Sequence, residues 1–220
     1  MKHTLISITT LFLLAGLARA QDTPLSQIII DGEGWKVAEK EAVPKVLPPS
    51  VVQSKAGATY MADAGQKMLR VGRTEGTNLV VDETKFAGAG RPTCVALWPD
   101  EGHLVVGDAD GAYLWAFRIE KDGKLGPGDR YYSLRVKRGE KASGVSALTV
   151  DSAGRVYACT PLGVQVFDPT GRLSGVLLRP GDGEMKAVAF GGEKGDTLFV
   201  QCGDTVYARK TKATGVPPKK

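Results

Sequence analysis

Short apolar runs separated by glycine-containing turns recur along most of the chain. Each unit of the pattern holds an apolar run, a turn with glycine, a second apolar run, a short loop and a third run that ends in polar residues. The runs are rich in β-branched residues and too short for helices, so they predict strands. The first strands of the four units begin at Val51, Val95, Ala147 and Ala187.

Four correlated repeats of this kind predict an all-β fold, a β-propeller of about four recognisable blades. The units start about 40 to 50 residues apart, which is the period of known blade repeats. The linking stretches 77–82 and 131–136 can supply outer fourth strands. An irregular β-sandwich is the alternative that this strand pattern leaves open.

The repeat also divides the chain into segments. Residues 46–210 form the predicted propeller domain, and residues 21–45 form an N-terminal segment without a clean repeat. Within that segment, Ile28–Ile30 could be an edge strand that closes the ring or pairs with a neighbour. Residues 211–220 are expected to be a flexible, solvated basic tail.

The first 20 residues have the pattern of a secretory signal peptide. A short polar start is followed by the apolar run 4–17 and by Ala18-Arg19-Ala20, a small-residue cleavage site. The apolar run is shorter than the ~20 residues that span a bilayer, which disfavours the alternative of an uncleaved anchor. We therefore expect a secreted or periplasmic protein with no membrane span after cleavage.

Composition narrows the choice of partners. With 42% hydrophobic and 24% charged residues, disorder along the whole chain is excluded. The formal charge of +5 falls to +3 without Lys2 and Arg19, and no dense basic face remains, so nucleic-acid binding has no support. Cys94, Cys159 and Cys202 form no C-x-x-C motif, which excludes a zinc or redox motif but leaves their pairing open.

Several stretches resemble one known family. Pro92–Asp108 is similar to "P-N-G-V-A-L-S-P-D … L-Y-V-A-D", and Leu148–Asp168 to "M-T-V-D-x-x-G-R-L-Y-V-A-T-x-x-G-V-Q-V-F-D". Phe190–Gly203 is similar to "F-G-G-x-x-x-x-T-L-Y-V-T-C", and Asp31–Trp35 to the entry segment of bacterial members. These motifs resemble the senescence-marker-protein/gluconolactonase family, also called regucalcin-like. The chain would be a shortened, divergent member.

The resemblance implies a fold and a chemistry. Family members are six-bladed propellers that hydrolyse sugar lactones and hold one divalent metal, often calcium, at the top of the central channel. Such a metal polarises the lactone carbonyl and lowers the pKa of an attacking water, while a carboxylate acts as base. The resemblance therefore implies a divalent cation such as calcium as the cofactor.

The family's metal ligands are not matched in this sequence. The family's Asn in "P-N-G" falls on Thr93, its Asp in "D-G-M-T-V-D" falls on Ser146, and its Glu in "E-G-P" falls near Pro49 or Ser50. Neutral hydroxyls bind calcium far more weakly than carboxylates do. The resemblance thus implies an eroded metal site.

Three aspartates are weak substitutes for the missing ligands. Asp63, Asp108 and Asp110 end or follow the second strands of the first two units. They could form a carboxylate cluster facing the channel, or they could cap turns by accepting hydrogen bonds from loop N–H groups, the reading we favour. His103, the sole histidine after the leader, has no triad partners, and no catalytic residue is assigned.

These observations favour an exported, non-catalytic member of the family that binds a ligand or a partner. The ligand would be a small molecule such as a sugar or lactone. The alternative is a metal-dependent sugar-lactone hydrolase with altered ligands. A third hypothesis is a homo-oligomer that completes the ring, because unpaired terminal blades need a partner.

Overall fold

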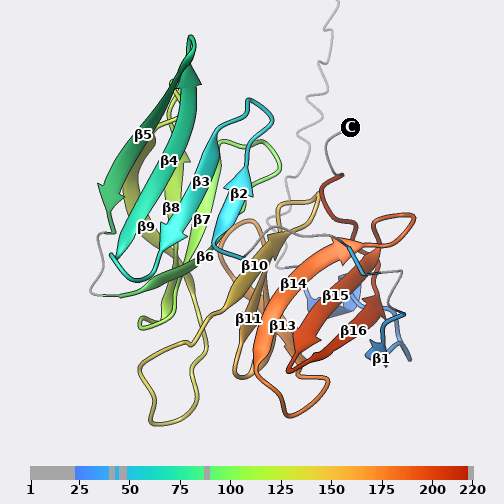
Figure 1. Ribbon diagram of the computed structural model, residues 1–220. Coiled ribbons are helices and arrows are strands. Elements are labelled where there is room, and N and C mark those ends of the chain that lie inside the picture. The colour runs from blue at the N-terminus through green and yellow to red at the C-terminus, as the bar shows by residue number, and fades with distance from the viewer. Residues whose placement is uncertain (1–22, 40–42, 45–48, 87–89, 218–220) are drawn as a thin grey trace, which may run out of the picture.

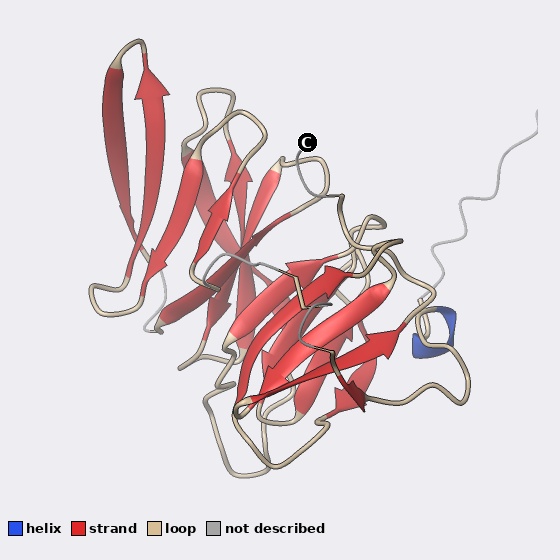
Figure 2. Cartoon of the chain, turned by 45° about the vertical axis from the view of Figure 1, so that its right-hand side comes forward, coloured by secondary structure: helices blue, strands red, loops and turns tan. Residues whose placement is uncertain are grey.

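The computed structural model describes residues 23–39, 43–44, 49–86 and 90–217. The expected signal peptide, residues 1–20, lies outside this part of the chain. Within it, one short 3-10 helix, η1 (Leu25–Gln27), accompanies sixteen strands (Figures 1 and 2). None of the described helices is long and apolar enough to cross a membrane.

Four antiparallel four-stranded sheets make up the described fold, each one blade of a propeller (Figure 1). Three blades follow chain order, β2 to β5, β6 to β9 and β10 to β13. The fourth has the order β1-β16-β15-β14. The predicted β-propeller with four blades is therefore confirmed, and the β-sandwich alternative is wrong. The strands are β1 (Lys36–Val37), β2 (Val51–Gln53), β3 (Thr59–Asp63), β4 (Met68–Glu75), β5 (Asn78–Lys85), β6 (Pro92–Leu97), β7 (His103–Asp108), β8 (Tyr113–Ile119), β9 (Leu125–Ser133), β10 (Ala147–Val150), β11 (Val156–Thr160), β12 (Gly163–Phe167), β13 (Leu173–Leu178), β14 (Met185–Gly191), β15 (Thr197–Cys202) and β16 (Thr205–Lys210).

The outer strand of the second blade lies earlier than the sequence pattern predicted. The stretch 131–136 was expected to form it, but β9 ends at Ser133. After that point the backbone turns away, because the buried side-chain amide of Gln165 bonds both the N–H and the carbonyl of Arg135, each at 2.8 Å. Gly128 lets β9 pass Phe117 closely, since a Cβ there would lie 2.3 Å from the ring. Because β9 contains glycine in place of apolar side chains, it lacks the alternating apolar pattern by which a strand is predicted from sequence.

Residues from both ends of the described chain meet on the fourth blade. Strand β1 forms its outer edge by pairing antiparallel with β16. The expected edge strand at Ile28–Ile30 is reduced to a single bridge between Ile29 and Thr211. Ile28 is instead fully buried in the core between the third and fourth blades.

The expectation of a flexible tail over 211–220 is wrong for its first residues. Thr211 and Ala213 are buried, and Gly215 bridges to Asp151. The backbone N–H of Lys212 also donates to the carbonyl of Ile28 at 2.7 Å. These contacts fix the chain well beyond β16.

Apolar residues fill the spaces between neighbouring blades. Each fully buried aliphatic or aromatic side chain there contributes about 1.5–3 kcal/mol to stability. The largest fully buried examples in the three interfaces are Tyr60, Leu69, Leu104 and Phe117 between the first and second blades, Leu114, Tyr132 and Phe167 between the second and third, and Ile28, Tyr157 and Leu198 between the third and fourth.

The two end blades differ on the faces turned away from their neighbours. On the first blade, Arg70 pairs with Asp63 and Glu83, at 2.5 and 2.9 Å. On the fourth blade, Pro44 packs close to Gly191 at the end of β14. The inner strands β2, β6, β10 and β14 line a groove of about 1200 Å³.

Candidate functional site

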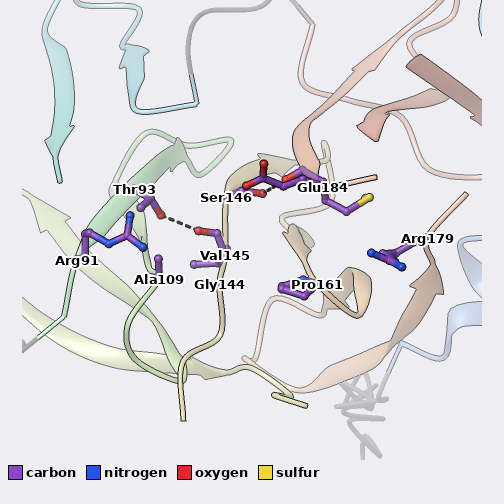
Figure 3. Close-up of a pocket in the computed structure, with 10 residues that line it drawn as sticks. Arg91, Thr93, Ala109, Gly144, Val145, Ser146, Pro161, Arg179 and Glu184 are labelled. Carbon is purple, nitrogen blue, oxygen red and sulfur yellow. Dashed lines mark hydrogen bonds between the residues drawn. The ribbon is translucent and has the colours of Figure 1, made fainter. Parts of the chain in front are cut away.

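A cavity of about 390 Å³ lies at the face of the propeller where the inner strands of the last three blades begin. We call it the strand-start pocket (Figure 3). Its walls come from the starts of β6, β10 and β14 and from the segments that follow β7, β11 and β13. The lining residues are Arg91, Thr93, Ala109, Gly144, Val145, Ser146, Pro161, Arg179, Glu184 and Met185. Both family-matched positions, Thr93 and Ser146, thus belong to one cavity.

A β-bulge places Thr93 on this wall. Pro92 is paired with Asp108 and Cys94 with Gly107, so Thr93 is an extra residue between two pairs. Proline is tolerated at this first strand position, where no N–H is needed for the ladder. A bulge of this kind redirects a side chain. The Thr93 hydroxyl donates a hydrogen bond to the carbonyl of Val145, with an Oγ1···O distance of 2.7 Å.

Ser146 makes the same kind of bond one blade further along. Its hydroxyl donates to the carbonyl of Met185 at 2.5 Å. Thr93 therefore joins the second blade to the third, and Ser146 joins the third to the fourth, as the dashed lines in Figure 3 show. We call these two bonds the hydroxyl latches. Each uses the one proton that a hydroxyl can donate.

The charges at the pocket do not fit a calcium ion. Calcium takes six to eight oxygen ligands and favours carboxylates. One carboxylate, that of the exposed Glu184, lines the pocket, together with the guanidinium groups of Arg91 and Arg179. No three His, Cys, Asp or Glu residues of the described ranges stand together as a possible metal site. The donor set is therefore wrong for a hard dication, and two cations beside it would oppose one.

The three aspartates considered as substitutes line no part of this pocket. Asp63 accepts a bond from the N–H of Gln66 at 2.9 Å and pairs with Arg70. The Gln66 N–H, followed by Arg70, holds the pKa of this carboxyl below its usual value. Asp110 pairs with Arg91 at 3.2 Å.

Asp108 acts as a buried turn cap. Its Oδ1 accepts bonds from the N–H groups of Arg91, at 2.9 Å, and Gly111, at 3.1 Å. A Cβ on Gly90 would lie 1.7 Å from this oxygen, and a Cβ on Gly111 would lie 2.4 Å from Oδ2. The structure thus places the aspartates in turns and ion pairs: Asp108 and Asp110 both bond Arg91, while Asp63 lies apart on the first blade.

Neither the histidine nor the three cysteines are among the residues that line the pocket, although the Thr93 hydroxyl lies 3.7 Å from the Cys94 sulfur. His103 begins β7, near the opposite end of the blade, and its ring lies 5.2 Å from that of Trp98. All three cysteines are buried and unpaired with one another. Burial raises the pKa of the Cys94 thiol to about 12 and also raises that of Cys159. The thiols of Cys94 and Cys159 therefore stay protonated near neutral pH and are poor nucleophiles.

Three charged residues of the pocket were missed by the sequence analysis. Arg91 stands two residues before Thr93, Glu184 stands directly before β14, and Arg179 follows β13. Arg91 and Glu184 each stand directly before an inner strand in the structure, but the sequence pattern placed the starts of those strands later, at Val95 and Ala187. Arg179 belongs to a connection whose course only the fold reveals.

Comparison with known proteins places the chain among lactonase-like propellers. The model of the family described as "SMP-30/Gluconolactonase/LRE-like region" matches residues 50–203. A curated gluconolactonase from Zymomonas mobilis subsp. mobilis is 30% identical over 135 residues, which is 59% of this chain and 37% of that protein.

Solved structures agree on the fold. A calcium-binding regucalcin from Agrobacterium tumefaciens superposes with a TM-score of 0.60 and 13% identity, covering 77% of this chain and 63% of that one. A gluconolactonase from Xanthomonas campestris superposes with a TM-score of 0.58 and 20% identity, covering 73% and 56%. The chain thus spans 37% of the curated relative and about three fifths of these two structures.

Proposed function

We propose a binding role without catalysis for this chain, which belongs to the SMP-30/gluconolactonase/LRE-like family. The protein is exported, binds a small polar molecule in the strand-start pocket and does not hydrolyse lactones. Export is supported by the apolar run 4–17 and the small-residue site Ala18-Arg19-Ala20.

The hydroxyl latches are the observation that carries this proposal. Metal-assisted lactone hydrolysis needs a cation on the carbonyl and a base for the attacking water. Thr93 and Ser146 stand where the resemblance puts two metal ligands, but they are neutral hydroxyls, which bind calcium weakly, and both donate their protons to backbone carbonyls. They therefore hold neighbouring blades together directly, which is a structural task.

The end blades support a protein that works as one chain. A second copy that completes the ring would have to dock on the ion pairs of Arg70 with Asp63 and Glu83, or displace Pro44 from the fourth blade. Removing such charges from water costs free energy unless the partner replaces every interaction.

The alternative is a lactone hydrolase that retains activity with altered ligands. The 30% identity to a curated gluconolactonase favours it. In that case Glu184 would be the base, because it is the one carboxylate among the residues that line the pocket. Both hypotheses predict ligand binding in the same place and differ in turnover.

Lactone turnover by the purified chain separates them. Gluconolactone is offered with calcium, with zinc or with a chelator, and acid release is followed against the spontaneous rate. We expect no acceleration above that rate. A saturable, metal-dependent rate that Glu184→Gln abolishes and Glu120→Gln, on the β8–β9 turn, preserves would establish the hydrolase instead.

A further inference from the structure

The strand-start pocket carries its positive charge on side chains. Arg91 and Arg179 lie on opposite sides of it, with Gly144, Val145 and Pro161 between them (Figure 3). Opposing these two guanidinium groups is the single exposed carboxylate of Glu184. The lining residues alone thus have an excess of positive charge.

Both guanidinium groups have hydrogen-bonding capacity to spare. Arg91 bonds Asp110 through Nε at 3.2 Å, and within the described part of the chain its two terminal nitrogens hold no partner. Arg179 reaches the Asp182 carbonyl at 3.5 Å and its carboxylate at 3.8 Å. Both contacts are long, and the Asp182 side chain is fully exposed. An incoming acceptor would replace them at small cost.

The connection between β9 and β10, whose end forms part of the pocket wall, is also rich in positive charge. It is anchored by Gln165 on the backbone of Arg135, and by the Ser143 hydroxyl, which donates to the Asp108 carbonyl at 2.8 Å. It ends in Gly144 and Val145 on the pocket wall. The exposed charged residues of this connection are Arg135, Lys137, Arg138, Glu140 and Lys141. An excess of one charge raises the local concentration of oppositely charged ligands.

We propose that the strand-start pocket binds a small hydroxylated organic oxyanion through Arg91 and Arg179, with protein cations standing where the family chemistry uses a metal. A guanidinium group offers two parallel N–H donors that match a carboxylate or a phosphate. The hydroxyl oxygens of Thr93 and Ser146 keep free lone pairs and, with Glu184, accept bonds from the ligand's own hydroxyls.

The size of the cavity is consistent with such a ligand. A volume of about 390 Å³ lies at the low end of the range of small-molecule sites. A six-carbon sugar acid or a phosphorylated sugar fits this range. The proposal rests on the binding role above and adds the charge of the ligand.

Calorimetric titration of the purified chain tests the proposal. The probes are gluconate, 6-phosphogluconate and inorganic phosphate, with glucose as the uncharged counterpart of gluconate and calcium chloride as the cation. We expect an acid to bind, glucose and calcium to fail, and binding to weaken as sodium chloride is raised. Gluconate alone would identify a carboxylate as the recognised group, and the phosphorylated probes alone would identify a phosphate.

Variants that remove one positive charge each locate the site. Arg91→Gln and Arg179→Gln should each weaken binding roughly ten- to a hundredfold, since each removes a charge-assisted hydrogen bond. Arg118→Gln is the matched control. Arg118 is exposed and lies opposite His103 in the β7–β8 register, far from the starts of the inner strands that form the pocket. It should change affinity by less than about twofold.

Several results would overturn the proposal. They are glucose binding as tightly as gluconate, binding that neither pocket variant weakens, or calcium binding with no acid bound. Lactone turnover is read separately. Turnover without acid binding would refute both the non-catalytic role and this inference. If the chain shows no turnover and also binds no acid, this inference alone is refuted.

Discussion

Replacing Thr93 with valine removes one hydroxyl latch while keeping the shape of the side chain. The lost bond is the 2.7 Å contact from the Thr93 hydroxyl to the Val145 carbonyl, which joins the second blade to the third. A net hydrogen bond contributes about 0.5–1.5 kcal/mol. The carbonyl stands on the wall of a pocket that water can enter, so the cost of leaving it without its partner stays near the middle of that range.

Thr93→Val should therefore lower the free energy of unfolding by about 1 kcal/mol. In a domain of this size, such a loss lowers the melting temperature by roughly 2–4 °C. Ser146→Ala, which removes the second latch, should have an effect of similar size. The Val145 carbonyl and Ser146 belong to consecutive residues, so the two latches are coupled, and the loss in the double variant should depart from the sum by about 0.5 kcal/mol or more.

Urea denaturation followed by tryptophan fluorescence measures these losses. Thr149→Val is the control, because Thr149 lies on the inner strand β10, is half-buried and holds no side-chain hydrogen bond within the described ranges. It should change stability by less than about 0.5 kcal/mol. If Thr93→Val were as stable as the parent protein, the latch would contribute nothing, and the argument that Thr93 is committed to structure would fail.

Other predictions concern the metal site, the thiols and the leader. The double variant Thr93→Asn with Ser146→Asp should bind calcium more tightly than the parent protein, with Glu184 as the third ligand. Adding Glu184→Gln should abolish this gain in a calorimetric titration. If the double variant gains no calcium affinity, the assignment of these two positions is wrong. Cys94 should resist Ellman's reagent at pH 8 until urea is added. Its thiol has a raised pKa in the folded state, so between about pH 9 and pH 12 the unfolded chain loses this proton first and stability falls as pH rises. Cys94→Ala should flatten that loss in denaturation curves; an equal slope would exclude Cys94 as its source. The exported protein should begin at Gln21, which its intact mass measures, and a mass that includes residues 1–20 would contradict the cleavage site.

The inner three strands of each blade could be predicted because they are short apolar runs, and most clearly where both faces of the strand are buried. Strands such as β11 and β12 are buried at every position, and they read as short continuous apolar runs. The outer strands are half exposed and carry glycine or charge, as in β9 and β5, so their limits were less clear. Strand β1 has two exposed residues and was not expected at all.

Only some of the residues that line the pocket could be predicted from the sequence. Thr93 and Ser146 were found through family motifs, and the structure places both on one pocket. Their hydrogen bonds could not be predicted, because each acceptor carbonyl belongs to the next blade. Arg91 and Arg179 were missed for the same reason, since residues 88 positions apart become neighbours only when three blades are assembled.

The pairing of β1 with β16 has a consequence for biosynthesis. Within each of the first three blades, every strand bonds to the one made just before it, so these sheets can form as the chain leaves the ribosome. Lys36–Val37 are made early, but their partners, Tyr207 and Ala208, are made some 170 residues later. At about 5–20 residues per second, this edge waits some ten to thirty seconds for its partner. The last blade is thus completed only after nearly the whole described chain has been translated, and in a nascent chain halted before β16 the outer edge of β15 would lack its partner strand.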